Sequence, residues 1–376
     1  MLRAAARRVL VLFAALLIVV IGAACSGSDS AFDGSRLERD DGAEGTPVPA
    51  AAAPTPKTFG TGAPGELVVG FRPPADHPIA ADVLAPFYAA VGDATGGSVT
   101  FDVYPDAEIV QGALTYQGVI EGTHDIGWGQ QVLTAGRFPA TSTVELPYVF
   151  TSAAEATDVL WTLYDDYFEL RDEYQDVKLL GLWARDPGYI WTTTSEAASI
   201  GDLEGLALGV PGPIQQDLVV ALGAIPAPLL PSEVQGAFQA DEVDGVLASA
   251  SAMSTLGLTG EVVSGIACRC ATTTEFLVMD LAEYEAMPPE QQAAIDDNSG
   301  RQLSMAAAEV YDRTGAAALA EIASAGGQVT DLDDDAIAEW SNATQSVLDS
   351  WIAAGDDTRL PTAAMYDRMV ILVEGE

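Results

Sequence analysis

Apolar residues follow two spacings along most of the chain, and these spacings predict strands that alternate with helices. Residues 66–71 have the pattern of a buried strand, since only apolar residues and a glycine follow Glu66, and residues 99–104 alternate with period two. Between them, residues 79–95 have the spacing of an amphipathic helix. Further strands are predicted at 125–128, 179–183, 206–210 and 275–280, and further helices at 113–121, 153–171, 215–222 and 232–239. This alternation predicts an α/β fold with mostly parallel sheets.

The C-terminal part of the chain has a helical pattern. Residues 289–325 and 333–354 are predicted to be mainly helical, and Asp333, Asp334 and Asp335 stand where acidic side chains stabilise a helix N-terminus. The roughly 310 residues that start at Glu66 suffice for two lobes of ordinary size. We therefore predict two α/β lobes followed by long C-terminal helices.

The N-terminal pattern is different. Three arginines among the first eight residues precede an uncharged apolar run over residues 9–21, and small residues then lead to Cys25. This order is typical of an export signal with a lipoprotein cleavage site, and the run is shorter than the about 20 residues of a membrane-spanning helix. We predict that residues 1–25 hold the signal peptide and the lipidation site, with an uncleaved anchor as the alternative. The protein would be exported and lipid-anchored to the outer face of the cell membrane.

Residues 26–65 have the composition of a tether. They are rich in Ser, Gly, Asp, Ala and Pro, and their bulky apolar side chains are Phe32, Leu37 and Phe59. Such a segment buries too little apolar surface to offset the entropy of ordering it, which predicts disorder.

The chain is strongly acidic. Its 55 Asp and Glu against 16 Lys and Arg give a formal net charge of -39, and removal of the leader makes it three units more negative. Such a surface argues against nucleic acid and anionic lipid head groups as partners. A solvated acidic surface in a saline exterior or a biased genome explains the charge, and attraction of a cationic ligand is the alternative.

Cys268 and Cys270 are the thiols that remain beside Cys25. Alternate residues of a strand face the same side, which strains a bond between them and leaves a metal site short of ligands. We predict two buried or weakly paired cysteines and no metal site, with a disulfide as the open alternative in an oxidising exterior.

Several short segments, in order along the chain, carry a family resemblance over nearly all of residues 66–325. They lie at 77–78, 95–105, 118–126, 145–150, 200–206, 210–212, 222–224, 232–234, 243–245, 277–279 and 287–289. Together they resemble the DctP-like solute-binding proteins of TRAP transporters. The resemblance implies a two-lobe fold of the periplasmic-binding-protein type, class II, with a cleft that closes on a solute. It implies lobe I at 66–187 plus 272–311 and lobe II at 188–271 plus 312–376.

The function implied by the resemblance is that of a solute-binding lipoprotein. It would capture a small organic solute in the interlobe cleft and deliver it to the membrane subunits of a TRAP-type secondary transporter. The alternative is a binding lipoprotein that serves sensing or surface scaffolding without transport. Enzyme activity and a cofactor are not expected, because the histidines are His77 and His124 and no hydrolase, zinc-protease or phosphate-loop motif is present.

The departures from the family concern the ligand's carboxylate. The family holds it with an arginine at the position of Gly209, because a guanidinium forms two charge-assisted bonds to a carboxylate. A second arginine aligns with Tyr189 or Ile190, and an asparagine aligns with Ala248. Either the cleft binds something other than a simple carboxylate, or it recruits a cation from elsewhere. Because a buried carboxylate without a cation is costly, we expect neutral, aromatic or cationic solutes to bind better than small carboxylates.

Ligand-binding residues are expected just after the strands, where the two lobes meet. Arg72 and Arg185 could replace the missing cation, although Arg72 could be a solvated loop residue and Asp186 could neutralise Arg185. Aromatic candidates could form a wall of the cleft or belong to the core. The ligand-binding candidates are Arg72, His77, Trp128, Gln130, Arg185, Tyr189, Trp191, Gly209, Gln235 and Ala248.

Overall fold

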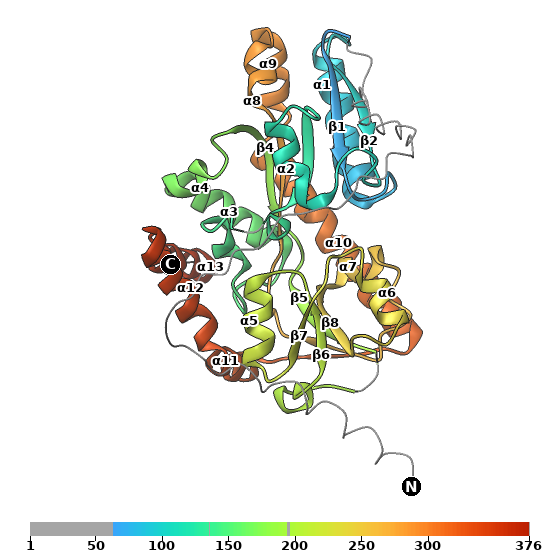
Figure 1. Cartoon of the computed structure of the whole chain (residues 1–376), viewed down its shortest axis with the longest axis vertical. Coiled ribbons are helices and arrows are strands. Elements are labelled where there is room, and N and C mark those ends of the chain that lie inside the picture. The colour runs from blue at the N-terminus through green and yellow to red at the C-terminus, as the bar shows by residue number, and fades with distance from the viewer. Residues whose placement is uncertain (1–62, 135, 194–195, 376) are drawn as a thin grey trace, which may run out of the picture. The chain divides into compact units, whose positions relative to one another are not determined.

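The computed structural model describes residues 63–134, 136–193 and 196–375, which form two mixed β-sheets with helices packed on them (Figure 1). Cys25, the leader and nearly all of the predicted tether lie outside the described residues, so their assignments stay predictions. Within the described part, no helix is both long enough and apolar enough to cross a membrane.

The first sheet has the strand order β2-β1-β3-β10-β4. Its strands are β1 (Glu66–Phe71), β2 (Thr100–Tyr104), β3 (Ile126–Gln130), β4 (Val177–Ala184) and β10 (Thr274–Asp280). β1 pairs in parallel with β2 and β3, whereas β10 runs antiparallel to β3 and β4. All five strands coincide, within a few residues, with strands predicted from the hydrophobic pattern.

The second sheet has the strand order β11-β9-β5-β8-β6-β7. Its strands are β5 (Gly188–Thr192), β6 (Ala207–Val210), β7 (Ile225–Pro228), β8 (Gly245–Ser249), β9 (Ser264–Ala267) and β11 (Gln328–Asp331). β6 is parallel to β7 and β8, and β9 is parallel to β11, whereas β5 is antiparallel to β8 and β9.

The antiparallel pairs qualify the prediction of mostly parallel sheets. Each of them involves β5 or β10, the two strands that follow directly on a strand of the other sheet without a helical crossover. A strand that comes from the other sheet starts at the edge where its new neighbours end, so it runs against them. The hydrophobic spacing of a strand carries no information about this direction.

The described helices, besides short 3-10 and π turns, cover both sheets. They are α1 (Ala85–Ala94), α2 (Thr115–Ile120), α3 (Ala153–Asp166), α4 (Phe168–Asp172), α5 (Pro213–Ala221), α6 (Val234–Gln239), α7 (Ala250–Thr255), α8 (Leu281–Ala286), α9 (Pro289–Asp297), α10 (Arg301–Ala325), α11 (Asp334–Ala343), α12 (Gln345–Thr358) and α13 (Thr362–Glu374). One core cluster joins α1, α9 and α10 to β1, and another joins α2, α3 and α13 to β4 and β10. On the second sheet, α5, α11 and α12 pack with β6 and β9, and α6, α7 and α10 pack with β5 and β8.

Two helices, α10 and α13, concern the predicted boundaries of the two lobes. α10 contributes to the cores of both sheets and lies between them in Figure 1. α13 packs against α3, and its Met365 and Met369 are buried with Leu182 and Phe276 of the first sheet. The assignment of residues 312–376 to lobe II stays a prediction, and α13 itself packs on the first sheet.

The two segments that connect the sheets, residues 185–187 and 268–273, are joined by backbone hydrogen bonds. Arg185 N donates to Thr273 O at 2.9 Å, and Gly188 N donates to Ala271 O at 2.6 Å. Cys270 N in turn donates to Gly188 O at 3.1 Å. The two connections therefore form one paired element between the sheets.

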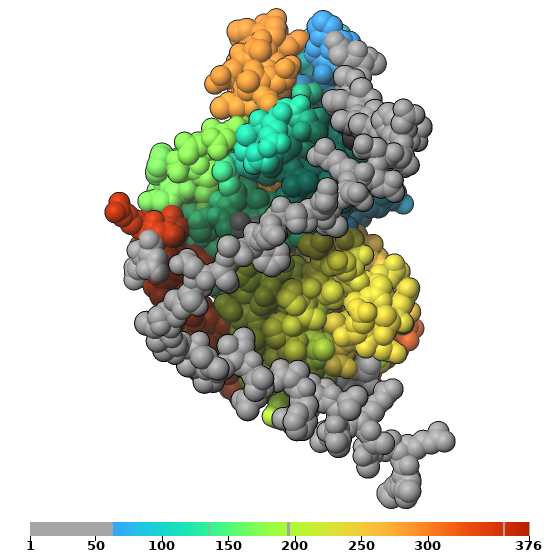
Figure 2. All heavy atoms as spheres, viewed as in Figure 1, coloured from blue at the N-terminus to red at the C-terminus, as the bar shows by residue number. Residues whose placement is uncertain are grey.

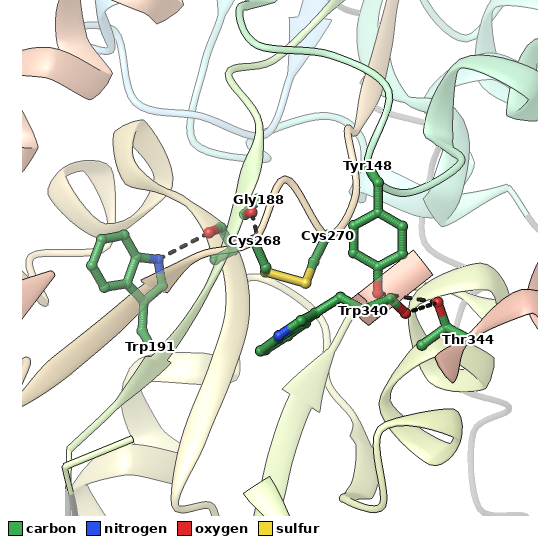
Figure 3. Close-up of a disulfide and its surroundings, with 8 residues drawn as sticks. Tyr148, Gly188, Trp191, Cys268, Cys270, Trp340 and Thr344 are labelled. Carbon is green, nitrogen blue, oxygen red and sulfur yellow. Dashed lines mark hydrogen bonds between the residues drawn. A yellow bond between two sulfur atoms is a disulfide. The ribbon is translucent and has the colours of Figure 1, made fainter. Parts of the chain in front are cut away.

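A disulfide joins Cys268 and Cys270 in the second of these connections (Figure 3). The disulfide is the alternative that the sequence left open, and the premise that these cysteines are alternate residues of a strand is wrong. β9 ends at Ala267, and Arg269 has a φ of 52°, which turns the chain between the two cysteines. Their Cα atoms are 4.9 Å apart, a separation that a disulfide ordinarily spans. Both cysteines are fully buried, and Trp340 of α11 packs in the same cluster.

Candidate functional site

A cavity of about 150 Å³ lies where strands of the two sheets end. The first sheet contributes residues that follow β1, lie on β3, follow β4 or begin β10. The second sheet contributes residues from β6, β8, α6, α7 and the segment after β7. Seven of the ten candidate residues line this cavity: Arg72, His77, Trp128, Gln130, Arg185, Gly209 and Ala248.

Arg72 provides a cation without a direct hydrogen-bond or ion-pair partner among the described residues. It comes directly after β1 and is half-buried at the cavity. Within the described part of the chain, its guanidinium takes part in no hydrogen bond or ion pair. Burial lowers the pKa of Arg72, and the charge of Arg185 lowers this pKa further, while Glu275 raises it. An anionic ligand would relieve this unfavourable environment, because it would supply the missing opposite charge.

His77 is a neutral hydrogen-bond donor beside Arg72. Its ring lies edge-on to Trp128 at 5.2 Å between centroids, and its Nδ1 accepts the amide proton of Ile79 at 3.2 Å. Burial lowers the pKa of His77 to about 4, and the charge of Arg185 adds to this effect. The imidazole is therefore uncharged near pH 7. Because Nδ1 accepts this hydrogen bond, Nε2 carries the ring hydrogen of the neutral imidazole and can donate a hydrogen bond to a ligand.

Glu275 is the residue that organises the first-sheet side of the cavity. Its side chain is 1% exposed, and its carboxylate accepts hydrogen bonds from β3, from β4, from the residue after β4 and from α10. The donors are Trp128 Nε1 at 2.9 Å, Gln130 Nε2 at 3.1 Å, Trp183 Nε1 at 3.0 Å, Tyr311 Oη at 2.7 Å and the residue that follows β4, Arg185, at 3.5 Å. Gln130 is thereby oriented with its amide nitrogen toward Glu275, which leaves its carbonyl oxygen to accept from a ligand.

Arg185 is held largely by protein groups. Its side chain forms an ion pair with Glu275 at 3.5 Å and donates to Ser251 Oγ at 3.4 Å. Its guanidinium carbon lies 4.6 Å from the ring centroid of Tyr311, and its Nε is buried without a partner. Asp186, the neutralising group considered from the sequence, instead accepts from the backbone and hydroxyl of Ser251. Glu275 is therefore the ion-pair partner of Arg185, and the charge of Asp186 also favours the charged guanidinium.

The second-sheet side of the cavity is mainly apolar. Leu229, Val234 and Val246 line it, and the segment with α6 and α7 forms one continuous yellow area of the surface in Figure 2. A Cβ atom at Gly209 would lie 3.1 Å from Leu229 Cδ1. The position where the family has an arginine is therefore closed by Leu229 in this chain.

Three candidates do not line the cavity. Trp191 is fully buried behind the apolar side, where it packs with Val246 and donates from Nε1 to Ala248 O at 2.9 Å. Tyr189 stacks on Trp191 with ring centroids 4.7 Å apart. Both belong to the core of the second sheet, the alternative considered for them, whereas Gln235 is exposed on α6.

Sequence reasoning missed Glu275 and Leu229. Glu275 had a usable signal, because an acidic residue directly before the apolar run of residues 276–279 is buried at a cost and needs donors. Leu229 had none, because it follows a short strand that contains two prolines and resembles a loop. Arg72 and Arg185 both line the cavity, which agrees with the alternative of a cation recruited from elsewhere, and the expected discrimination against carboxylates stays a prediction. In the described part of the chain, no cluster of His, Cys, Asp and Glu side chains is arranged to hold a metal.

Comparison with known proteins places this geometry in context. Residues 70–354 match the family described as bacterial extracellular solute-binding protein, family 7. The outer membrane transporter protein TsaT of Comamonas testosteroni is 21% identical over 280 residues, which cover 73% of this chain and 82% of that protein.

Solved structures of TRAP solute-binding proteins have the same fold. One, from an unidentified marine microbe, is specific for aromatic acid ligands and was solved with metahydroxyphenylacetate. It has a TM-score of 0.78 and 25% identity, and the match covers 82% of this chain and 98% of that one. Another, from Bordetella bronchiseptica with bound (R)- and (S)-mandelate, has a TM-score of 0.76 and 24% identity over 82% of this chain and 99% of that one.

These matches bear out the resemblance seen in the sequence and the predicted two-lobe α/β fold. The family and its structural relatives are receptors for small solutes and not enzymes. The chain belongs to the bacterial extracellular solute-binding proteins of family 7.

Proposed function

We propose that this protein is a lipid-anchored receptor that captures a small organic solute outside the cytoplasm and delivers it to TRAP-type membrane subunits. The family membership supports solute capture and the partnership with a transporter. The leader that ends at Cys25 supports the anchor. The flexible composition of residues 26–65 would let the folded part reach its membrane partner.

The solute that the cavity fits best is a carboxylate with an apolar, aromatic body. The observation that carries this proposal is the unpaired Arg72 guanidinium opposite an apolar wall that includes Leu229 and Val246. His77 Nε2 and the Gln130 carbonyl oxygen offer one further donor and one further acceptor beside Trp128. The relative that is specific for aromatic acids supports the same ligand class. This proposal replaces the expectation of a neutral or cationic solute.

A calorimetric panel at fixed salt tests the ligand class. Benzoate and phenylacetate should bind at micromolar concentrations or more tightly. Benzamide should bind at least about tenfold more weakly, because a charge-assisted bond contributes about 1.5–3 kcal/mol. Benzylamine should not bind, because its charge would face Arg72. Equal binding of benzamide and benzoate, or tight binding of benzylamine, would contradict the proposal.

Substitution of Arg72 tests the residue that carries the proposal. Arg72→Gln should weaken benzoate binding by about 10- to 100-fold and leave benzamide binding almost unchanged. The matched control is Arg313→Gln, which removes an exposed arginine paired with Asp82 outside the cavity. Loss of benzoate binding in both variants would point to a general charge effect and not to Arg72.

The anchor and the delivery step have separate tests. Cys25→Ser should abolish acylation, which mass spectrometry would detect. We expect the wild-type protein in the membrane fraction, and the variant should be lost from that fraction. Deletion of the gene should abolish uptake of radiolabelled ligand if the receptor feeds a transporter. Unchanged uptake would favour the alternative of a sensor or surface scaffold.

A further inference from the structure

The charges at the cavity add up to one net positive charge. Among the described residues that line it, the ionised side chains are Arg72, Arg185 and Glu275. His77 is neutral near pH 7 because burial lowers its pKa to about 4. Asp186 does not line the cavity; its carboxylate accepts hydrogen bonds from the backbone and hydroxyl of Ser251, and its charge adds to that of Glu275 in favouring the charged form of Arg185.

The geometry around Glu275 assigns the three charges to distinct roles. Its two oxygens accept from five donors, so the carboxylate is held as an acceptor at a fixed position. Arg185 lies 3.5 Å from one of these oxygens and stacks on Tyr311, which fixes it to the same network. Arg72 has no such partner in the described part of the chain. Glu275 is therefore the ion-pair partner of Arg185, whereas Arg72 interacts with Glu275 only at longer range and has no direct partner among the described residues.

We propose that Glu275 is a specificity-determining residue that restricts the cleft to solutes with a single negative charge. This inference rests on the proposed function, in which Arg72 holds the ligand's carboxylate. A second carboxylate in the closed cavity would find no free cation, and it would be repelled by Glu275. The cleft therefore selects aromatic monocarboxylates over dicarboxylates with the same ring.

The test compares two ligands of the same shape that differ in one charge. Isophthalate carries two carboxylates, and 3-carbamoylbenzoate replaces one of them with a neutral amide. The wild-type protein should bind 3-carbamoylbenzoate at least about tenfold more tightly than isophthalate. Glu275→Gln releases Arg185 from its counter-ion, so this preference should shrink by at least about tenfold.

Two variants separate the charge of Glu275 from its structural role. Tyr311→Phe removes one donor to Glu275 without changing any charge at neutral pH, and the preference should stay within about threefold of wild type. The double variant Glu275→Gln with Arg185→Gln keeps one net positive charge, so the preference of the wild type should return. A preference that is unchanged in Glu275→Gln would overturn the inference.

Arg185→Gln keeps the inference falsifiable if Glu275→Gln does not fold. In this variant Glu275 opposes Arg72, so binding of 3-carbamoylbenzoate should fall at least about tenfold and should recover in the double variant. Wild-type affinity in Arg185→Gln would overturn the inference. If the wild-type protein binds benzoate but shows no preference between the two test ligands, only the specificity inference fails. If it binds no aromatic monocarboxylate at all, the proposed function fails with it.

Discussion

The two sides of the cavity are built on opposite principles. The first-sheet wall includes Arg72, His77, Trp128, Gln130, Arg185 and Glu275, whose polar groups are fixed by one another or face the cavity unpaired. The second-sheet wall consists mainly of apolar residues, namely Val210, Leu229, Val234, Val246, Leu247 and Ala248. One wall provides charge and hydrogen bonds, and the other provides apolar surface for the body of the ligand.

This difference explains how the chain departs from its family without losing a cation. The sequence resemblance aligns the family's arginine with the segment that is β6 here, on the second-sheet wall. In this chain that position is Gly209, closed by Leu229, and the unpaired arginine is Arg72 on the opposite wall. The charge needed for a carboxylate can thus move across the cleft while the fold stays the same.

The largest expected effect comes from removing the side chain that packs behind the apolar wall, which tests whether this wall depends on the core of the second sheet. Trp191 is fully buried behind Val246 and hydrogen-bonds to Ala248 O. Trp191→Ala should lower the free energy of unfolding by about 3–5 kcal/mol, measured by urea denaturation, because a large buried side chain leaves a cavity. Ligand affinity of the folded fraction should fall as well, because the wall loses its backing.

The control for this variant is another tryptophan that is remote from the cleft. Trp351 of α12 is half-buried and donates to Ser142 Oγ at 2.9 Å. Trp351→Ala should destabilise the protein but leave ligand affinity unchanged. If Trp191→Ala lost stability and kept full affinity, the second wall would not depend on the packing behind it.

A second prediction tests the difference between the polar and the apolar wall by placing a charge in the apolar one. Ala248→Asp puts a carboxylate opposite Arg72, so benzoate binding should weaken by at least about 100-fold. Ala248→Asn has almost the same volume and no charge, and it should change the affinity by less than about fivefold. Calorimetry on both variants separates charge from shape, and equal losses would show that only shape matters at this position.

The sequence predicted the fold better than the site, for physical reasons. Hydrophobic spacing reports which face of an element is buried, so all five strands of the first sheet were found. It does not report strand direction, and it did not show that the predicted helix at 153–171 breaks at Tyr167 between α3 and α4.

The sequence predicted those site residues whose residue type and position at a strand end already indicate ligand binding. Arg72, His77 and Gln130 are polar residues at strand ends, and the structure places them at the cavity. Trp191 was a candidate for the same reason, its place in a strand near the cleft. Its side chain nevertheless lies in the core, because the register of the strand decides which side each residue faces. The role of Glu275 depends on donors from distant parts of the sequence, such as Trp128 and Trp183. The role of Leu229 depends on its contact with Gly209 on the neighbouring strand. Local sequence patterns contain neither of these contacts.

A third prediction concerns the buried acid that supports the polar wall. Glu145 accepts from Thr274 N at 3.1 Å and from Thr274 Oγ1 at 2.8 Å, at the start of the strand that carries Glu275. Burial raises the pKa of Glu145 to about 7. Because this is above the unfolded value, the group stabilises the fold at pH values below about 4.5, and this contribution is lost as the pH rises through about 7.

Glu145→Gln should remove this pH dependence, because the amide is neutral at every pH. The gain in unfolding free energy of the variant over wild type should be about 2 kcal/mol larger at pH 8 than at pH 5. Thermal denaturation at the two pH values measures it, with exposed Glu290→Gln as the control. An equal difference at both pH values would show that Glu145 does not titrate in this range.

The smallest expected effect refines the shape of the apolar wall at Gly209. A Cβ there would lie 3.1 Å from Leu229 Cδ1, close enough that Leu229, which lines the cavity, must shift slightly. Gly209→Ala should cost less than about 1.5 kcal/mol of stability and weaken benzoate binding by about two- to fivefold. The loss should grow with ligand size, so 2-naphthoate should suffer more than benzoate. Gly236→Ala on α6, where a Cβ meets nothing within 4 Å, is the control and should leave both affinities unchanged. An equal loss for the two acids would mean that Leu229 does not set the size of the cavity.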